Sequence, residues 1–202
     1  MNPYLSIAII GLLFILLFGG LSIIRREGFS AQFAWEVLAI SAALMGFVWL
    51  SGIPLSPVLV LIVIYLLSMR VRILVDLANL LSGRGRQKNA IQLLQFSLRL
   101  NPDRSSRMVV LVNMGIVQLR RQNPASAQEL FEMALSEGGQ GGLGIKYEAA
   151  CRYNYGVALM RQGQEAPAVR EFNEVTVIYP NSPFSQAAQA ALQKRRDERR
   201  NS

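Results

Sequence analysis

The spacing of apolar residues divides the chain into two parts at about residue 70. Before that point apolar residues run almost without interruption, and no charged residue occurs from Pro3 to Ile24 or from Val37 to Met69. Beyond it, apolar residues recur every three or four positions between polar ones, the pattern of helices that bury one face. We therefore expect an all-α chain with an apolar segment at 1–69 and a helical domain at 70–202.

The apolar segment predicts three transmembrane helices, at about residues 3–24, 33–50 and 54–69. Runs of this kind are about as long as a helix that crosses a hydrocarbon core of roughly 30 Å. Prolines in "SGIPLSP" at 51–57 interrupt helical hydrogen bonding, so this stretch predicts a hairpin between the second and third helices. A cleaved signal peptide is disfavoured because nothing basic precedes the first run. A buried hairpin of a soluble protein is the alternative for the other two, but the downstream chain offers too few amphipathic helices to cover them.

Basic residues predict how these helices are oriented. Loops on the cytoplasmic side are enriched in Lys and Arg. Arg25 and Arg26 follow the first helix, the 51–57 hairpin has no basic residue, and Arg70 and Arg72 open a basic segment after the third helix. We expect a multi-pass protein of a bacterial plasma membrane, with its N-terminus outside and its C-terminal domain in the cytoplasm. The four arginines would then lie at the inner surface, close to anionic lipid headgroups.

Small residues recur at one spacing in the second part of the chain. A small residue is followed twelve positions later by another and then, four positions on, by a large apolar residue. The three sets are Ala78, Ala90 and Leu94; Gly115, Ala127 and Phe131; and Gly156, Ala168 and Phe172. Small residues let two helices approach closely, so each set predicts an antiparallel helix pair. Gly85 or Gly163 would make the turn within a pair, and Pro102 or Pro180 would follow its second helix.

These spacings resemble the tetratricopeptide repeat (TPR), with fits at about 71–104, 108–141 and 149–182. The resemblance implies an α-solenoid of stacked helix pairs, and a generic helical bundle is the alternative. The second repeat departs from the pattern, because it has "QNPA" in place of a turn glycine and "SEGGQGGLG" at 136–144 in place of a terminal proline. After Pro180 we expect a C-terminal capping helix at about 183–200, capped by Ser182, with an alanine stripe on the third repeat and its basic end in solvent.

The segment that joins the two parts has no helix-breaking residue. Neither Gly nor Pro occurs between Val58 and Ser82. We therefore expect the third transmembrane helix to continue as one helix into the first repeat, which would fix the repeat array relative to the bilayer.

Stacked helix pairs form a concave groove that normally binds a partner protein. The residues expected in it are Asn79, Val109, Val112, Asn113, Ile116, Leu119, Tyr153, Asn154, Val157, Met160 and Arg161. TPR adaptors that bind acidic chaperone tails need basic residues where this chain has Val75, Ala150 and Asn154. A partner helix or an extended apolar segment is therefore the expected ligand. The expected function is a membrane-anchored scaffold or adaptor, such as an assembly factor of a membrane complex; the alternative is a small structural or transport subunit that acts through its transmembrane helices.

Composition argues against catalysis and nucleic-acid binding. The chain has no histidine, so it lacks the usual general base and metal ligand. Its one cysteine, Cys151, falls at an apolar helix position and is expected to be a buried structural thiol. The net charge of +8 comes without a helix-turn-helix, zinc finger or aromatic platform, so no nucleic-acid partner is expected. Glu36 lies near the membrane rim and is interpreted as an anchor. We expect no enzyme activity, metal or cofactor.

Overall fold

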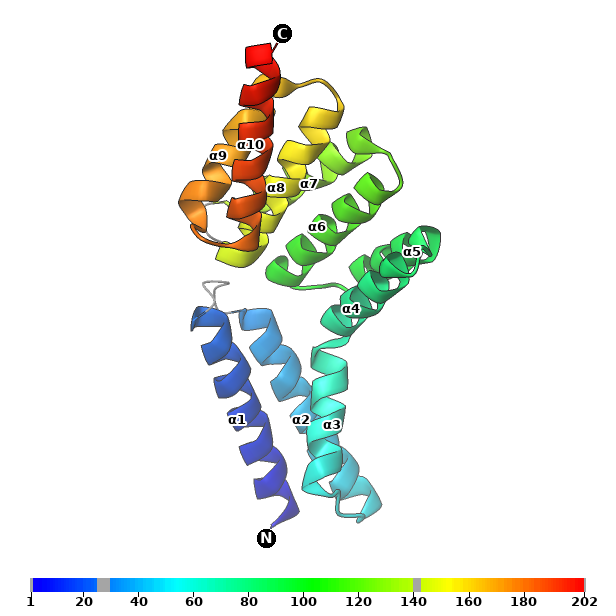
Figure 1. Ribbon diagram of the computed structural model, residues 1–202. Coiled ribbons are helices and arrows are strands. Elements are labelled where there is room, and N and C mark those ends of the chain that lie inside the picture. The colour runs from blue at the N-terminus through cyan, green and yellow to red at the C-terminus, as the bar shows by residue number, and fades with distance from the viewer. Residues whose placement is uncertain (1, 25–29, 140–142, 202) are drawn as a thin grey trace.

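The computed structural model describes residues 2–24, 30–139 and 143–201, and these residues form an all-helical structure (Figure 1). The predicted all-α fold class is confirmed. The helices are α1 (Pro3–Ile24), α2 (Ala31–Ser51), α3 (Pro57–Ser68), α4 (Arg70–Gly83), α5 (Gln87–Arg99), α6 (Arg104–Arg120), α7 (Pro124–Gly138), α8 (Ile145–Arg161), α9 (Glu165–Ile178) and α10 (Pro183–Asn201).

Helices α1, α2 and α3 form an apolar bundle below the rest of the chain (Figure 1). Its interior holds a small set of buried side chains, among them Ile7, Val37 and Ile64, while many leucines on its outside are exposed. Gly11 permits the close approach of α1 and α2, because a Cβ there would overlap Ser41 Oγ. Both α1 and α2 are long and apolar enough to cross a membrane, and the count reaches three when the bent pair of α3 and α4 is taken as one span.

The third apolar helix is shorter than predicted. It begins at Pro57 instead of residue 54, because Ser56 is its N-cap and accepts a hydrogen bond from Leu59 N at 3.2 Å. Its 12 residues correspond to a rise of about 18 Å, less than the hydrocarbon core of a bilayer. Helix α3 therefore differs from α1 and α2, which are 22 and 21 residues long.

The expected continuous helix from Val58 to Ser82 is wrong, because α3 and α4 meet at a bend of 69°. Side chains at the bend bond to carbonyls of the last turns of α3. Ser68 Oγ donates to Ile64 O at 2.6 Å and Arg70 Nη1 donates to Leu67 O at 2.8 Å. Such side-chain bonds compete with the helical ladder and bend helices without Gly or Pro. The junction is nevertheless only one residue long.

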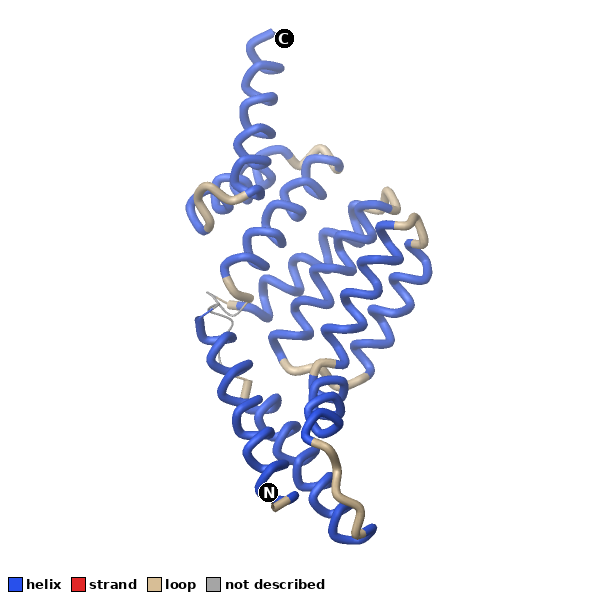
Figure 2. The backbone as a smooth tube through the Cα atoms, turned by 60° about the horizontal axis from the view of Figure 1, so that its bottom comes forward, coloured by secondary structure: helices blue, strands red, loops and turns tan. Residues whose placement is uncertain are grey.

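The remaining helices stack as three antiparallel pairs, α4 with α5, α6 with α7 and α8 with α9 (Figure 2). The predicted seams are present: a Cβ on Gly115 would lie 2.6 Å from Phe131 Cε1, and one on Gly156 would lie 2.7 Å from Phe172 Cε1. In the first pair Ala78 takes the glycine position and is fully buried. Each pair thus matches a small residue on its first helix to the side chain that faces it.

The turns within the pairs share a left-handed residue, two positions after the first helix ends. It is Gly85 at φ 78°, Gln122 at φ 59° and Gly163 at φ 74°. A side chain makes this conformation unfavourable, and glycine adopts it freely. The missing turn glycine of the second pair is therefore replaced by a glutamine held in the same conformation.

Helix α10 covers the last pair as expected. Ser182 Oγ accepts a hydrogen bond from Ser185 N at 3.0 Å, and Ala188 is fully buried against α8 and α9. The basic end differs from the prediction, because Arg195 is only 7% exposed and forms an ion pair with Glu165. Lys194 beside it is exposed.

Candidate functional site

The structure buries part of the expected groove. Val109, Val112 and Leu119 are between 1% and 6% exposed and belong to the core between the helix pairs. Asn113 is 8% exposed. These four side chains of α6 are not available to a partner in this arrangement. Fewer side chains of α6 are therefore accessible in the groove than the sequence predicted.

The other predicted residues keep some exposure. Asn79 and Arg161 are exposed, and five are half-buried: Ile116, Tyr153, Asn154, Val157 and Met160. The asparagine amides bond within their own helices, since Asn113 Nδ2 donates to Val109 O at 2.7 Å and Asn154 Nδ2 donates to Ala150 O at 2.8 Å. Asn154 is half-buried, and its amide oxygen can still accept a hydrogen bond from a ligand.

Helix α10 contacts two of the predicted groove residues. The Tyr153 ring lies 6.2 Å from the Phe184 ring of α10 and 5.8 Å from the Phe172 ring of α9. Met160 Sδ lies 3.5 Å from Arg195 Nη1 of α10. The C-terminal helix therefore occupies this part of the groove. The other predicted residues that keep some exposure are Asn79 of α4, Ile116 of α6, and Asn154, Val157 and Arg161 of α8.

Two arginines at equivalent positions connect the second helix pair to the first and the third pair to the second. Arg120 at the end of α6 donates to Ser82 Oγ of α4 at 2.8 Å, and Arg161 at the end of α8 donates to Leu119 O of α6 at 2.8 Å. Arg161 also reaches Gln122 Oε1 at 3.4 Å. Because both arginines hold the ends of adjacent first helices together, they help to fix the angle between the pairs.

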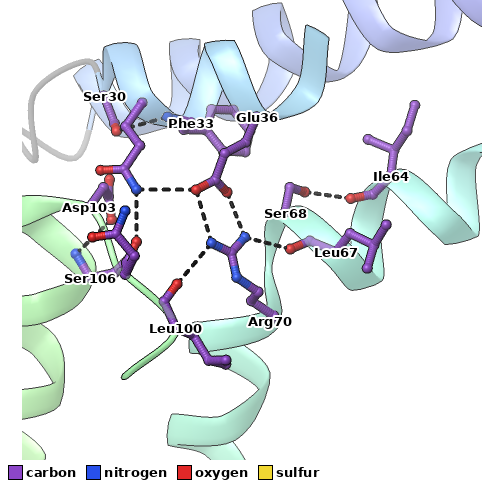
Figure 3. A network of polar contacts seen from close by, with 12 residues as sticks. Ser30, Phe33, Glu36, Ile64, Leu67, Ser68, Arg70, Leu100, Asp103 and Ser106 are labelled. Atoms are coloured by element: carbon purple, nitrogen blue, oxygen red, sulfur yellow. Dashed lines mark hydrogen bonds and ion pairs between the residues drawn. The ribbon is translucent and has the colours of Figure 1, made fainter. Parts of the chain in front are cut away.

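A polar cluster joins the apolar bundle to the helix pairs (Figure 3). Arg70, at the start of α4, makes two hydrogen bonds to Glu36 of α2, with distances of 2.6 and 2.9 Å. Arg70 Nη2 also donates to Leu100 O, at 3.1 Å, just after α5. A bidentate arginine–carboxylate pair is stronger and more directional than a single ion pair. Arg70 thus connects α2, α3, α4 and the segment between α5 and α6.

A second contact reinforces this junction. Gln32 Nε2 donates to Glu36 Oε1 at 3.1 Å and to Asn101 O at 2.8 Å. Asn101 has a φ of 51°, which turns the chain between α5 and α6. The sequence pointed to Glu36 as an anchor and to Arg70 as a surface residue, but gave no sign that the two form a pair.

A cavity of about 220 Å³ lies beside the junction, between the upper ends of the apolar helices and the start of α6. Aromatic rings of Phe18, Phe33 and Tyr65 line one part, and the acidic residues Asp76 and Asp103 line another. Asp103 also caps α6 by accepting from Ser106 N at 3.0 Å. The lining is mixed, so the cavity has no single ligand chemistry.

The four arginines expected at the membrane surface have different surroundings. Arg70 is paired with Glu36, and Arg72 is half-buried and lines the cavity. Arg25 and Arg26 lie outside the described residues. The charge of Arg70 is therefore balanced by the Glu36 carboxylate, so Arg70 is not available to a lipid headgroup.

The structure gives no support to a catalytic role for Cys151. Its thiol is fully buried and lies 3.7 Å from Phe131 O. Burial raises the pKa of the Cys151 thiol well above its usual range, which removes the reactive thiolate. Within the described residues, no group of three or more His, Cys, Asp or Glu side chains could hold a metal ion.

Apolar N-terminal helices followed by stacked antiparallel helix pairs define the class of protein as a helical repeat protein. The sequence model of the tetratricopeptide repeat family matches residues 150–182, which are most of α8 and all of α9. The chain therefore carries a tetratricopeptide repeat at residues 150–182, and the recognition made from its small-residue spacing is confirmed. Neither the curated proteins nor the solved structures include a match to the chain.

Proposed function

We propose that this chain is a membrane-anchored scaffold that holds a TPR array against the bilayer and binds partner proteins through it. TPR repeats indicate a role in protein–protein interaction. The observation that carries the proposal is the direct attachment of the array to the apolar bundle through Arg70 and Glu36. A scaffold joined to its anchor in this way presents its binding surface at one height and angle above the membrane.

The surface of the apolar bundle supports membrane insertion. Glu36 is the one charged residue within α1, α2 and α3 as described, and it is paired. Trp35 and Trp49, near the two ends of α2, are 72% and 75% exposed. Tryptophan is enriched at both interfaces of a membrane, so the two residues are suited to mark them. The paired Glu36 favours an anchor over a transport pathway, which would need an accessible intramembrane charge.

The arrangement of the ends supports the proposed orientation. The N-terminus and the repeat array lie at opposite ends of the apolar bundle (Figure 1). Three crossings, the third made by α3 together with the residues that flank it, would place them on opposite sides of the membrane. We propose an outward N-terminus and a cytoplasmic array in a bacterial plasma membrane, as the basic residues indicate.

The proposed partner site is the accessible part of the groove, on α4, α6 and α8. Asn79 of α4 and Asn154 of α8 offer amides, and Ile116 of α6 and Val157 of α8 offer apolar surface. Apolar contacts with a few amides suit an amphipathic helix or an extended apolar segment. We propose a protein partner of this kind, such as a subunit whose assembly into a membrane complex the chain assists.

Photo-crosslinking of the full chain in native membranes tests this function. A photoreactive residue at Asn79 or Asn154 is expected to capture the same partner. The control position is Glu129, which is exposed on the outer helix α7. Equal capture from Glu129, or different partners from the two groove positions, would rule out the groove as the binding surface.

A further inference from the structure

Helix α4 is apolar on two opposite sides. Val71, Val75 and Ala78 are buried against the rest of the array. Leu77 and Leu80 on the opposite side are 45% and 50% exposed. A helix that is apolar on both sides is normally covered on both. The outer side of α4 therefore needs a cover that the array does not supply.

The two ends of the array differ in this respect. At the C-terminal end, α10 covers the third pair and presents exposed charged residues such as Lys194 and Glu198. At the N-terminal end, the described helices that pack along α4 are α3, α5 and α6, and α2 meets its first residue, Arg70, through Glu36. Solenoids need polar outer faces at their terminal repeats to remain soluble. This end has leucines where such a face would be.

The residues next to α4 indicate that a bilayer covers its exposed leucines. Exposed leucines of α3, including Leu61, Leu66 and Leu67, precede α4 with one residue between the helices. The 69° bend turns α4 away from the axis of α3. Where α3 runs along the membrane normal, α4 therefore lies closer to the plane of the membrane than to its normal. The leucines of α4 thus continue the apolar surface of α3 along the membrane interface.

Basic residues at the C-terminal end of α4 also favour contact with a bilayer. Arg84, Arg86 and Lys88 are exposed in and just beyond the turn into α5. A helix with leucines on one side and basic residues beside them lies in a membrane interface, where anionic headgroups attract the basic residues. A second copy of the chain would bring two such basic clusters together, which like-charge repulsion disfavours.

We propose that α4 is an interfacial helix, with Leu77 and Leu80 inserted among the lipid headgroups and Arg84, Arg86 and Lys88 bound to anionic lipid. The bilayer surface then serves as the N-terminal cap of the repeat array. This inference rests on the proposed membrane anchoring, and it adds a second contact with the membrane outside the transmembrane bundle.

Lipid quenching of a fluorescent label tests the proposal. An environment-sensitive label is placed on Leu80→Cys in the full chain, in vesicles of phosphatidylcholine and phosphatidylglycerol at about three to one. Native Cys151 is buried and stays unlabelled, which the wild-type chain verifies. Brominated lipid is expected to quench the Leu80→Cys label several-fold more than a label on Val177→Cys, which is 76% exposed on α9. Leu77→Cys serves as a second reporter if the first variant does not fold.

A label on Leu61→Cys of α3 separates this proposal from membrane anchoring itself. Quenching at Leu61 with equal, weak quenching at Leu80 and Val177 would leave the anchor in place and overturn the interfacial helix. No quenching at Leu61 would overturn the anchoring as well. Self-quenching between Leu80 labels that disappears on dilution with unlabelled chain, without quenching by lipid, would assign the surface to a second copy and also overturn the proposal.

Discussion

Replacement of Gly115 by alanine tests whether the seam between paired helices depends on a missing side chain. Gly115 lies inside α6, and a Cβ there would lie 2.6 Å from Cε1 and 2.7 Å from Cζ of the Phe131 ring. Phe131 is fully buried, so its ring has little room to move. We expect Gly115→Ala to separate α6 from α7 and to destabilise the array.

Two opposing effects set the size of the change. Alanine favours a helix interior over glycine by about 1 kcal/mol. Overpacking of a well-packed core costs roughly 1–3 kcal/mol, and ring atoms under 3 Å away on a buried side chain put this site at the upper end. The net effect is a destabilisation of roughly 1–2 kcal/mol.

The single cysteine offers a local assay. Cys151 lies in the same core cluster as Phe131, and its thiol reacts only when the core opens. We therefore measure the rate of Cys151 alkylation in the full chain in detergent micelles. A loss of 1–2 kcal/mol predicts about 5- to 30-fold faster alkylation for Gly115→Ala, if opening and closing are fast compared with the reaction.

A second substitution, at Phe131, makes the test more specific. The first pair has Ala78 and Leu94 at the positions equivalent to Gly115 and Phe131, so a larger first residue there is accompanied by a smaller second one. We expect Phe131→Leu to restore much of the stability lost in Gly115→Ala, so that the two changes are not additive. Gly83→Ala is the control, because nothing lies within 4 Å of a Cβ there. Alkylation of Gly115→Ala at or below the wild-type rate would refute the close-contact argument.

Three further predictions concern the turn, the junction and the apolar bundle. Gln122→Gly should stabilise the array by about 1 kcal/mol and slow Cys151 alkylation, because it relieves a left-handed side chain, whereas Gly163→Ala should do the reverse. Arg70→Met should cost about 1–3 kcal/mol, because it leaves the Glu36 carboxylate without its cationic partner, although Gln32 still donates to it. The loss should appear as faster hydrogen exchange at residues 99–101 and 103, and the added Glu36→Gln change should reduce that effect. Unchanged exchange in Arg70→Met would refute the junction. Gly11→Leu should lower the melting temperature in detergent, whereas Gly20→Leu should not, because a Cβ at residue 20 meets nothing within 4 Å; equal melting temperatures would contradict the packing of α1 on α2.

The sequence predicted the elements that depend on local periodicity. The twelve-residue spacing placed Gly115 opposite the second helix of its pair, and Ser182 with Pro183 predicted the start of α10. Both signals arise within one helix or one helix pair, where residue spacing determines which side chains meet.

The features that the sequence missed depend on contacts between distant segments. Glu36 and Arg70 are separated by 34 positions, so no local pattern joins them. The bend at Met69 comes from side chains that bond to backbone carbonyls, and it leaves no Gly or Pro signal. The burial of Val109 and Leu119 depends on the angle between stacked pairs, which a repeat pattern alone does not determine.

The central claim is that the repeat array is held at a fixed position relative to a membrane anchor. Pulsed electron paramagnetic resonance between spin labels on Leu50→Cys at the far end of α2 and Glu129→Cys on α7 measures this directly in lipid nanodiscs. Our account predicts one narrow distance distribution, which broadens when Arg70→Met is added. A broad distribution in the chain with native Arg70, unchanged by that substitution, would contradict it.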